Sequence, residues 1–457
     1  MNVFDLRQKL VTDYDRYTRS FINIADSDIR EFVDRELKSG NLWPEPLLQL
    51  NPTFKPGGKI SDLVKEGTLH SECAKIFKIK TEADPVGVDL LLHTHQARAI
   101  KRYKEGKSYV LTSGTGSGKS LAYIVPIVDH VLRRGSGHGI QAIVVYPMNA
   151  LANSQEQELQ KFLQLGYGQG HEPVRFARYT GQEKGPAREA IRAHPPDILL
   201  TNYMMLELLL TRVEDRELVR AAQGLRFLVF DELHTYRGRQ GADIAMLIRR
   251  CRIAFGGDHL ICVGTSATMA SAGTSEDQRH EVSRVASSLF GTTIEPTEVI
   301  GETLERSTEE VEVKNKPART AIADAVMSGA APPSTYDEFC AHPLTAWIES
   351  TFGVRAETGT RDLIRQRPRR LTGAESAADE LARLTGASEE QCANVLRNFL
   401  LTGSQLRRDV SSRFPVFAFR LHQFFTRGDT VWATLEAVGI RYPSLSKLNA
   451  KPGDPDK

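Results

Sequence analysis

The chain has 457 residues, of which 40% are hydrophobic and 25% are charged. This composition is typical of globular proteins and excludes a wholly disordered, collagen-like or coiled-coil chain, and the length predicts two to four domains. Lys and Arg number 59 and Asp and Glu number 57, so the formal net charge is only +2. Any nucleic-acid site must therefore be a local patch rather than a property of the whole surface.

No apolar run approaches the ~20 residues that a membrane-spanning helix needs, and the first residues lack the basic start of a secretory signal. The five cysteines are scattered, and none forms a Cys-x-x-Cys pair. We therefore expect reduced thiols in a cytoplasmic protein, with no disulfide framework and no zinc site.

Residues 1–90 are predicted to form helices and loops, as a helical accessory region without catalytic residues. Residues 28–37 have helical spacing, and the sequence Trp43-Pro44-Glu45-Pro46 ends that helix.

Residues 91–302 alternate short β-branched runs with helical segments. The runs are apolar on both faces, which predicts strands of a parallel sheet covered by helices on each side. The predicted strands are residues 109–112, 142–146, 174–177, 197–200, 225–230 and 260–264. The predicted helices between them are residues 119–134, 150–165, 186–194, 203–210 and 241–255.

The remainder of the chain is predicted to carry a linker and an extension. Residues 303–340 are charged and then rich in Ala and Pro, which is typical of a linker. Residues 341–457 are predicted to form a mostly helical, partly strand-containing extension, in which Ser388 begins a helix.

A phosphate-binding loop is the first chemical motif, and it reads Ser113-Gly114-Thr115-Gly116-Ser117-Gly118-Lys119-Ser120. It follows a predicted strand and opens a predicted helix, which is the context that such a loop requires. Its glycines let backbone N–H groups turn onto phosphate oxygens at a helix N-terminus. We expect Lys119 to neutralise the β and γ phosphates and Ser120 to offer its hydroxyl to Mg²⁺. The strict pattern has Gly at the position of Ser113.

The second motif, Asp231-Glu232-Leu233-His234, directly follows a predicted apolar strand. A strand-end carboxylate such as Asp231 can hold Mg²⁺, usually through water, and the neighbouring Glu232 can orient and deprotonate an attacking water. The two motifs together predict a nucleotide hydrolase with Lys119, Asp231 and Glu232 as its catalytic residues.

With these motifs the chain resembles the superfamily 2 helicases, the group of DEAD-box and DEAH-box proteins. The loop matches their motif I, in which a small residue commonly replaces the first Gly. Residues 231–234 match motif II, and Ser266-Ala267-Thr268 match motif III, which couples the ATP state to nucleic-acid binding. The resemblance implies an α/β, RecA-like fold with ATP and Mg²⁺ as ligands. It also implies adenine recognition by Gln96, which follows His95 upstream of the loop, and coupling through His234.

Three further segments resemble family motifs that line the nucleic-acid track: residues 146–152 resemble motif Ia, 179–181 motif Ib, and 200–206 the segment after it. Backbone N–H groups and hydroxyls in such segments suit contacts with phosphates. Arg178 and Arg239 could add charge, although each arginine is equally open to being a solvated surface charge. The implied nucleic-acid contacts are Pro147, Met148, Asn149, Thr180, Gly181, Thr201, Asn202 and Arg237.

A finer resemblance covers residues 232–238 and the helix that ends at residues 248–250. It is to the large bacterial helicases with a C-terminal zinc-binding domain, which include relatives of the mitomycin-repair helicase and helicases of the anti-phage systems Druantia and DISARM. Residues 43–52 resemble the N-terminus of the anti-phage group. The resemblance implies a bacterial cytoplasmic enzyme of DNA repair or anti-phage defence, with DNA more expected than RNA and no membrane partner.

The resemblance ends after motif III. In the family, ATP lies between two RecA-like domains, and the second carries paired arginines. No Gln-x-x-Gly-Arg-x-Gly-Arg sequence follows Thr268, and the family's C-terminal cysteine cluster is missing. The basic cluster at residues 365–370 contains no glycine. A truncated product, a split gene and an engineered fragment all remain open explanations.

Two functions follow from this pattern. The first is the ATP-dependent motor domain of a helicase or translocase, completed by a missing C-terminal half or by a partner chain with the second RecA-like domain. The second is an ATP-gated nucleic-acid-binding scaffold with little turnover. Because arginine fingers are worth roughly 10³–10⁵ in rate, we expect this chain alone to bind ATP·Mg²⁺ but to hydrolyse it slowly and not to unwind.

Overall fold

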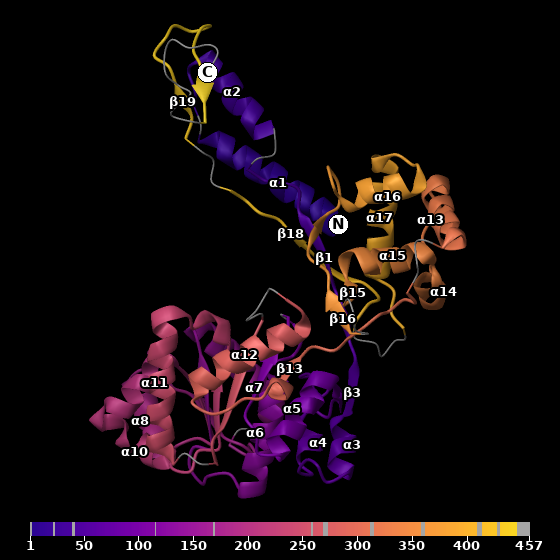
Figure 1. Cartoon of the computed structure of the whole chain (residues 1–457). Coiled ribbons are helices and arrows are strands. Elements are labelled where there is room, and N and C mark those ends of the chain that lie inside the picture. The colour runs from indigo at the N-terminus through magenta and orange to yellow at the C-terminus, as the bar shows by residue number, and fades with distance from the viewer. Residues whose placement is uncertain are drawn as a thin grey trace. The chain divides into compact units, whose positions relative to one another are not determined.

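The computed structural model describes residues 2–21, 23–38, 42–114, 116–167, 170–256, 259–267, 273–310, 315–357, 362–408, 414–426 and 430–445. The chain divides into two compact units (Figure 1). The first, here called the parallel-sheet unit, is Phe54–Thr303. The second, here called the split unit, combines Met1–Thr53 with Leu304–Lys457. No helix in the described residues has the length and apolar character that crossing a membrane requires.

The parallel-sheet unit contains a seven-stranded sheet in the order β13-β7-β12-β11-β8-β10-β9. All neighbouring pairs in it are parallel, as the sequence predicts. Its strands are β7 (Tyr109–Thr112), β8 (Ala142–Tyr146), β9 (Phe176–Arg178), β10 (Ile198–Asn202), β11 (Phe227–Phe230), β12 (Ile261–Ser266) and β13 (Val299–Gly301).

Helices cover both faces of this sheet, because its strands are apolar on both faces. On β8, for example, Val144 belongs to one core and Val145 to the other. Helices α4 to α7 pack on the first face and α9 to α12 on the second. The helices of the unit are α3 (Ile60–Lys65), α4 (Cys73–Ile76), α5 (Thr94–Lys104), α6 (Leu121–Arg134), α7 (Asn149–Leu163), α8 (Gly185–Ala193), α9 (Tyr203–Thr211), α10 (Arg216–Ala221), α11 (Gly238–Phe255) and α12 (Ser275–Phe290). Short strands β3 (Pro56–Lys59), β4 (Lys78–Ile79), β5 (Val88–Asp89) and β6 (Leu91–His93) precede the sheet.

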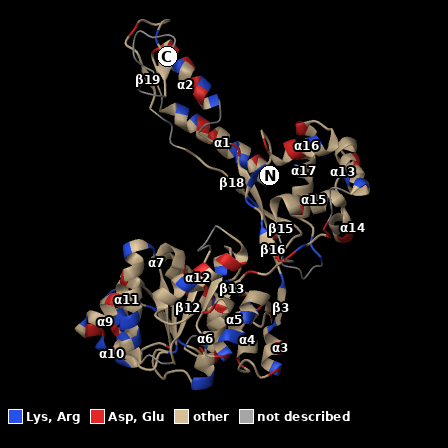
Figure 2. Cartoon of the chain, viewed as in Figure 1, with Lys and Arg blue, Asp and Glu red and all other residues tan. Residues whose placement is uncertain are grey.

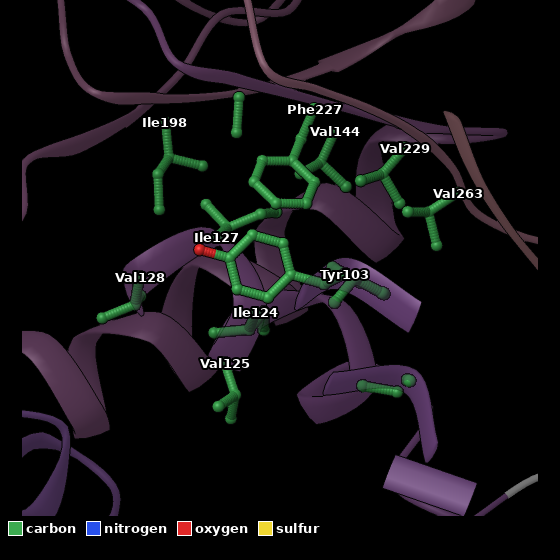
Figure 3. Packing of buried hydrophobic residues seen from close by; sticks show 14 of the residues in the cluster. Tyr103, Ile124, Val125, Ile127, Val128, Val144, Ile198, Phe227, Val229 and Val263 are labelled. Atoms are coloured by element: carbon green, nitrogen blue, oxygen red, sulfur yellow. The ribbon is translucent and has the colours of Figure 1, made fainter. Parts of the chain in front are cut away.

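Figure 3 shows the packing between the first face and helices α5 and α6. The rings of Tyr103 on α5 and Phe227 on β11 lie 5.5 Å apart between their centroids. Aliphatic side chains of α6, including Ile124 and Ile127, fill the space around them. Complete burial of each such side chain contributes about 1.5–3 kcal/mol, so this core holds the sheet edge described below in a fixed position.

All six predicted strands and all five predicted helices of this region are present, with boundaries shifted by a few residues. The structure adds a seventh strand, β13, and a long helix, α12, that the sequence prediction did not contain. The observed division also differs from the predicted boundaries. Residues 54–90, predicted to belong to the accessory region, are part of the parallel-sheet unit; Cys73 and Ile76, for example, are fully buried in its core.

The split unit combines an N-terminal segment with the C-terminal third of the chain. Its core lies between helices and the sheet β17-β1-β18, in which β1 pairs antiparallel with both neighbours. Its elements are α1 (Val3–Ser20), α2 (Ser27–Lys38), β1 (Leu47–Asn51), α13 (Lys316–Ser328), α14 (Tyr336–Ala341), α15 (Pro343–Phe352), β15 (Val354–Ala356), β16 (Leu363–Arg365), β17 (Arg369–Arg370), α16 (Ala377–Thr385), α17 (Glu389–Gly403), β18 (Ala418–His422), β19 (Trp432–Ala433) and β20 (Pro443–Ser444). Strands β2 (Thr53–Phe54) and β14 (Leu304–Glu305) lie where the chain crosses between the units.

Residues 303–340 are more ordered than the predicted linker. They include α13, whose Ile322 and Val326 are buried in the core of the split unit, and α14. The composition of this segment did not indicate a helix, because only a few apolar residues, on one face of α13, pack into the core. The predicted start of a helix at Ser388 is present, since the Ser388 side chain accepts a hydrogen bond from the Gln391 N–H at the start of α17. All five cysteines are free.

Candidate active site

The predicted catalytic motifs lie at the carboxyl edge of the parallel sheet. The phosphate loop follows β7, Asp231 follows β11, and Ser266 is the last residue of β12. These three strands are neighbours in the order β7-β12-β11. Because the carboxyl ends of parallel strands share one edge, residues far apart in the sequence become adjacent there.

The phosphate loop is held in place by contacts with its surroundings. The Ser113 N–H donates to the Ser266 carbonyl over 3.1 Å, and the Ser113 and Ser117 hydroxyl oxygens lie 2.7 Å apart. The Gly114 N–H donates to Glu302 Oε2 over 3.0 Å. Gly116 and Gly118 have φ of 82° and 70°, values that glycine adopts without strain. Thr115 lies outside the described residues.

Gln96 is bound to the loop rather than standing apart from it. Its Nε2 donates to the Gly118 carbonyl over 2.8 Å, and its Oε1 accepts from the His93 N–H over 2.8 Å. The neighbouring His95 Nε2 lies 2.9 Å from the Ser117 carbonyl oxygen, which requires the proton on that nitrogen. Burial lowers the pKa of His95, consistent with a neutral ring. The predicted adenine-reading residue thus also fixes the position of the phosphate loop.

Asp231 lies at the end of β11 beside a buried threonine. The Thr265 hydroxyl donates to Asp231 Oδ1, and the same hydroxyl oxygen accepts from the Glu232 N–H over 3.1 Å. Burial raises the pKa of the Asp231 carboxyl, and the Thr265 hydrogen bond and the Lys119 charge only partly oppose this effect. A bound cation next to Asp231 would favour its charged form.

Glu232 has a left-handed backbone, with φ of 53° and ψ of 54°. Only one other non-glycine residue in the described part of the chain, Glu375, has a positive φ. Such conformations cost about 1–3 kcal/mol and concentrate at functional sites. The Glu232 Oε1 is 3.2 Å from Lys119 Nζ, whereas its buried Oε2 makes no hydrogen bond with the described residues.

His234 connects motif II to motif III. It lies on the short 3-10 turn η2 (Leu233–Thr235), and its Nδ1 is 3.2 Å from Ser266 Oγ and 3.2 Å from Glu232 Oε2. The second distance is that of an ion pair if His234 is protonated, but its geometry is not that of a hydrogen bond. Ala267 directly follows Ser266, and the predicted coupling residue Thr268 lies outside the described residues.

The chemistry of the site suits Mg²⁺. Among the described residues, no three His, Cys, Asp or Glu side chains form a metal cluster. Mg²⁺ characteristically binds one or two protein oxygens, water and substrate phosphates rather than an all-protein cage. Ser120, at the start of α6, and Asp231, at the end of β11, can supply such oxygens.

The predicted nucleic-acid residues lie at the same edge, on the other half of the sheet. All but Arg237 lie at the ends of β8, β10 and β9, which are adjacent in that order next to β11. Arg237 instead follows β11 and η2 and directly precedes α11. Within this group, Asn202 Nδ2 donates to Asn149 Oδ1 over 2.7 Å, and Asn202 Oδ1 accepts from the Met205 N–H. The Asp231 N–H donates to the Val145 carbonyl over 2.9 Å and so joins the two halves.

The structure uses several of these polar groups internally. Thr201 is buried, and its hydroxyl donates to the Tyr179 carbonyl over 2.7 Å. The N–H and hydroxyl of the buried Thr180 both donate to Glu183 Oε2. Arg178 forms ion pairs with Glu156 and Glu183. These side chains shape the edge and are not presented to a ligand in this conformation.

Other predicted groups are exposed along this edge. Met148 is 57% exposed, Gly181 and Arg237 are exposed, and Pro147 is half-buried. Helices α7, α8 and α9 begin here without an acidic residue in the first turn. Their N-termini therefore keep the partial positive charge that favours phosphate.

Comparison with known proteins identifies this part of the chain. Residues 93–275 match the family model described as DEAD/DEAH box helicase. These residues form a DEAD/DEAH box helicase domain. This agrees with the superfamily resemblance expected from the sequence.

The relatives extend well beyond the length of this chain. The uncharacterized ATP-dependent helicase YprA of Bacillus subtilis is 31% identical over 199 residues, covering 42% of this chain and 25% of the relative. The Druantia protein DruE of Escherichia coli is 24% identical over 344 residues, covering 50% of this chain and 18% of the relative. A crystal structure of the DUF1998 helicase MrfA bound to DNA matches with a TM-score of 0.42 and 22% identity, over 64% of this chain and 36% of that chain. The chain thus spans a quarter or less of the length of the two relatives.

Three residues that organise the helicase domain were not predicted from the sequence: Thr265, Glu302 and Glu183. Thr265 directly precedes the predicted Ser266 on β12, and a buried hydroxyl next to a motif is a signal that could have been used. Glu302 follows a strand that was itself missed, and Glu183 lies in a charged loop, so neither carried a local signal.

Proposed function

We propose that this chain is the motor domain of an ATP-dependent nucleic-acid translocase, acting on DNA. The observation that carries the proposal is the division of one sheet edge. Nucleotide-binding motifs lie at the ends of β7, β12 and β11, and all candidate nucleic-acid residues except Arg237 lie at the ends of the adjacent strands β8, β10 and β9. One rigid sheet thereby links the two ligands.

In the proposed reaction, the nucleotide residues share the work of hydrolysis. Lys119 neutralises the β and γ phosphates, while Ser120 and Asp231 hold Mg²⁺, which would neutralise developing charge on the phosphates. Glu232 Oε2 accepts a proton from water as the water oxygen attacks the γ phosphorus, and ADP leaves. Rapid turnover would further need arginines from a second RecA-like domain, on a longer form of the chain or on a partner.

The His234–Ser266 contact supports coupling between the ligands. His234 is within 3.2 Å of both the proposed base and the end of β12. A change at Glu232 on ATP binding would move His234 and hence Ser266. Two ligands at separate sites are coupled when each of them binds one conformation of the protein more tightly than the other.

The test is the affinity for single-stranded DNA with and without a non-hydrolysable ATP analogue and Mg²⁺. For wild type we expect the analogue to shift the DNA affinity by about tenfold. Ser266→Ala should reduce that shift by about fivefold, since it removes one hydrogen bond of about 1 kcal/mol, without changing analogue affinity. Absence of any nucleotide effect on wild type would contradict the proposal, and a preference for RNA of the same length would correct its choice of DNA.

The DruE relative motivates a narrower role. DruE is a Druantia protein, and the likeness of residues 43–52 to anti-phage helicases lies outside the helicase domain. We propose anti-phage defence as the biological setting. A chain with Glu232→Gln should then fail to protect cells that the wild-type gene, in its complete locus, protects from phage.

A further inference from the structure

The basic cluster at residues 365–370, which the helicase motifs leave unexplained, becomes part of a sheet face in the split unit. In the sheet β17-β1-β18, Leu48 and Leu50 are buried in the core, at 0% and 3% exposure. Side chains alternate between faces along a strand, so Leu47, Gln49 and Asn51 lie on the opposite face.

The registers place basic residues on that opposite face. Arg370 and His422 are the partners of Leu47 on either side of β1, and Arg420 is the partner of Gln49. Directly paired residues lie on the same face. Arg420 and His422, two positions apart on β18, are separated by about 7 Å along the strand.

Side-chain hydrogen bonds bring the preceding segment onto the same face. Arg365 Nη1 donates to Asn51 Oδ1 over 3.3 Å, and Gln49 Nε2 donates to the Gln366 carbonyl over 3.3 Å. Arg367 therefore follows directly from a residue anchored on this face. We call Arg365, Arg370 and Arg420, together with Arg367 of the adjoining link, the basic sheet face. Figure 2 shows Lys and Arg in blue on the elements of this unit.

The segments that carry these arginines contain no acidic residue of their own. Residues 363–370, β1 and β18 contain no Asp or Glu. Arg367 and Arg370 are exposed and make no ion pair with the described residues. Arg369 differs, since it is the register partner of the buried Leu48 and pairs with Glu380 over 2.8 Å. The adjacent Arg370 is thus left without the carboxylate that its neighbour uses.

Four guanidinium groups, from β16, β17, β18 and the link between β16 and β17, are suited to a polyanion. Arginine binds phosphate through paired N–H donors and stays charged at all physiological pH values. The chain as a whole carries a net charge of only +2, so this concentration is local. Its four arginines flank β1 from both sides, so they can contact several phosphates of one strand rather than a single phosphate group.

We propose that the basic sheet face binds the phosphate backbone of single-stranded nucleic acid, without sequence preference and without requiring ATP. The inference rests on the proposed function only for the choice of nucleic acid as the polyanion. It gives the split unit, to which no activity is otherwise assigned, the role of a second contact with the strand. Such a contact would keep the chain bound while the nucleotide-dependent track releases.

The test compares wild type with Arg367→Ala/Arg370→Ala in binding a fluorescent oligothymidylate over a series of salt concentrations. Removal of one arginine–phosphate interaction should lower the slope of log affinity against log salt by about 0.7, so we expect a decrease of about 1.4 for the two arginines. Affinity at low salt should fall about threefold to tenfold. The control Arg16→Ala/Arg383→Ala also removes two exposed arginines of the split unit, but from α1 and α16, and should bind like wild type.

The outcomes separate this inference from the proposed function. Unchanged slope and affinity in Arg367→Ala/Arg370→Ala, with normal thermal unfolding, would overturn the inference and leave the helicase function standing. Loss of binding in that variant, together with a wild type that ignores the ATP analogue, would support the inference and contradict the proposed function. The inference would also be overturned if the variant lost binding to anionic phospholipid vesicles but kept its binding to oligothymidylate. If the alanine variant unfolds, Arg367→Gln/Arg370→Gln repeats the test with longer side chains.

Discussion

The carboxyl group of Asp231 accepts a hydrogen bond from Thr265 and lies near Lys119, yet burial still raises its pKa. When the pKa of an acidic group is higher in the folded state, the protein loses stability as the pH rises from the unfolded-state pKa of 3.8 through the folded-state pKa. At neutral pH, the charged form therefore opposes folding until a cation binds beside it.

Asp231→Asn should consequently separate stability from activity. Without Mg²⁺ we expect this variant to unfold at a temperature higher by roughly 1–3 °C, because a buried charge is removed. Mg²⁺-dependent ATP hydrolysis should be abolished. Thermal unfolding followed by circular dichroism at pH 7, without and with Mg²⁺·ATP, measures the stability effect, and phosphate release measures the activity. A variant less stable than wild type without ligand would contradict this account.

Substitution of Gly118 tests how closely the phosphate loop packs against Gln96. A Cβ at position 118 would lie 2.6 Å from Gln96 Nε2, and φ is 70°. Gly118→Ala should therefore displace Gln96 and weaken ATP binding by at least tenfold, as measured by fluorescence titration with a labelled ATP analogue.

The matched control is Gly67→Ala. Gly67 has a similar φ of 75°, but a Cβ there would meet nothing within 4 Å. It should lose about 1 kcal/mol of stability while binding ATP normally. Equal loss of ATP affinity in both variants would show that backbone strain, rather than the contact with Gln96, is responsible.

At the scale of elements, Asp129 on α6 explains why residues 54–90 belong to the parallel-sheet unit. Its carboxylate accepts from the His70 N–H over 2.6 Å, from Tyr103 Oη over 3.0 Å and from Lys104 Nζ over 2.7 Å. Burial alone would raise the pKa of Asp129, but hydrogen bonds from Lys104, Arg133 and His70 reverse this and lower it. One buried carboxylate thus joins α5, α6 and the segment that precedes them.

Asp129→Asn should destabilise the parallel-sheet unit by about 1–3 kcal/mol at pH 7. The loss should be smaller than for a fully buried ion pair, because Lys104 and Arg133 are partly exposed to water. A lowered folded-state pKa contributes stability above the unfolded value of 3.8, and this contribution is lost as the pH falls through the folded value. The free energies of unfolding of wild type and variant, measured with urea, should therefore converge at low pH. The exposed pair Asp62–Lys65 provides a control, since Asp62→Asn should cost less than about 0.5 kcal/mol.

Local patterns predicted the strands and helices that carry the motifs, because buried parallel strands are apolar on both faces and helices follow them. They did not predict β13, which is three residues long, or the strands at residues 47–59. The side-chain partners of the motifs were also hidden: nothing in the sequence links Gly114 to Glu302 or Thr180 to Glu183 more strongly than to other acids. Motif spacing predicts which residues meet at the edge, whereas packing decides which of their polar atoms stay available.

At the scale of the whole molecule, the split unit was the least predictable feature. Its central strand β1 pairs with β18, from which it is separated by more than 350 residues. Short antiparallel strands carry no signal that specifies a partner at such a distance. Residues 1–53 of the predicted accessory region and the predicted extension are therefore parts of one unit, and helices α13 and α14 of the predicted linker contribute to its core.

Lys119, Asp231 and Glu232 are proposed to form an ATP-hydrolysing site that needs arginines from a second RecA-like domain for rapid turnover. Steady-state ATP hydrolysis with Mg²⁺, with and without single-stranded DNA, tests this most directly when wild type and Glu232→Gln are compared. We predict a turnover of about 10⁻² s⁻¹ or slower for wild type, because a median enzyme turnover of about 10 s⁻¹ would be lowered at least about 10³-fold without the arginines. We predict no turnover for Glu232→Gln. Rapid DNA-stimulated turnover by wild type would contradict the need for a second domain, and turnover unchanged in Glu232→Gln would contradict the site itself.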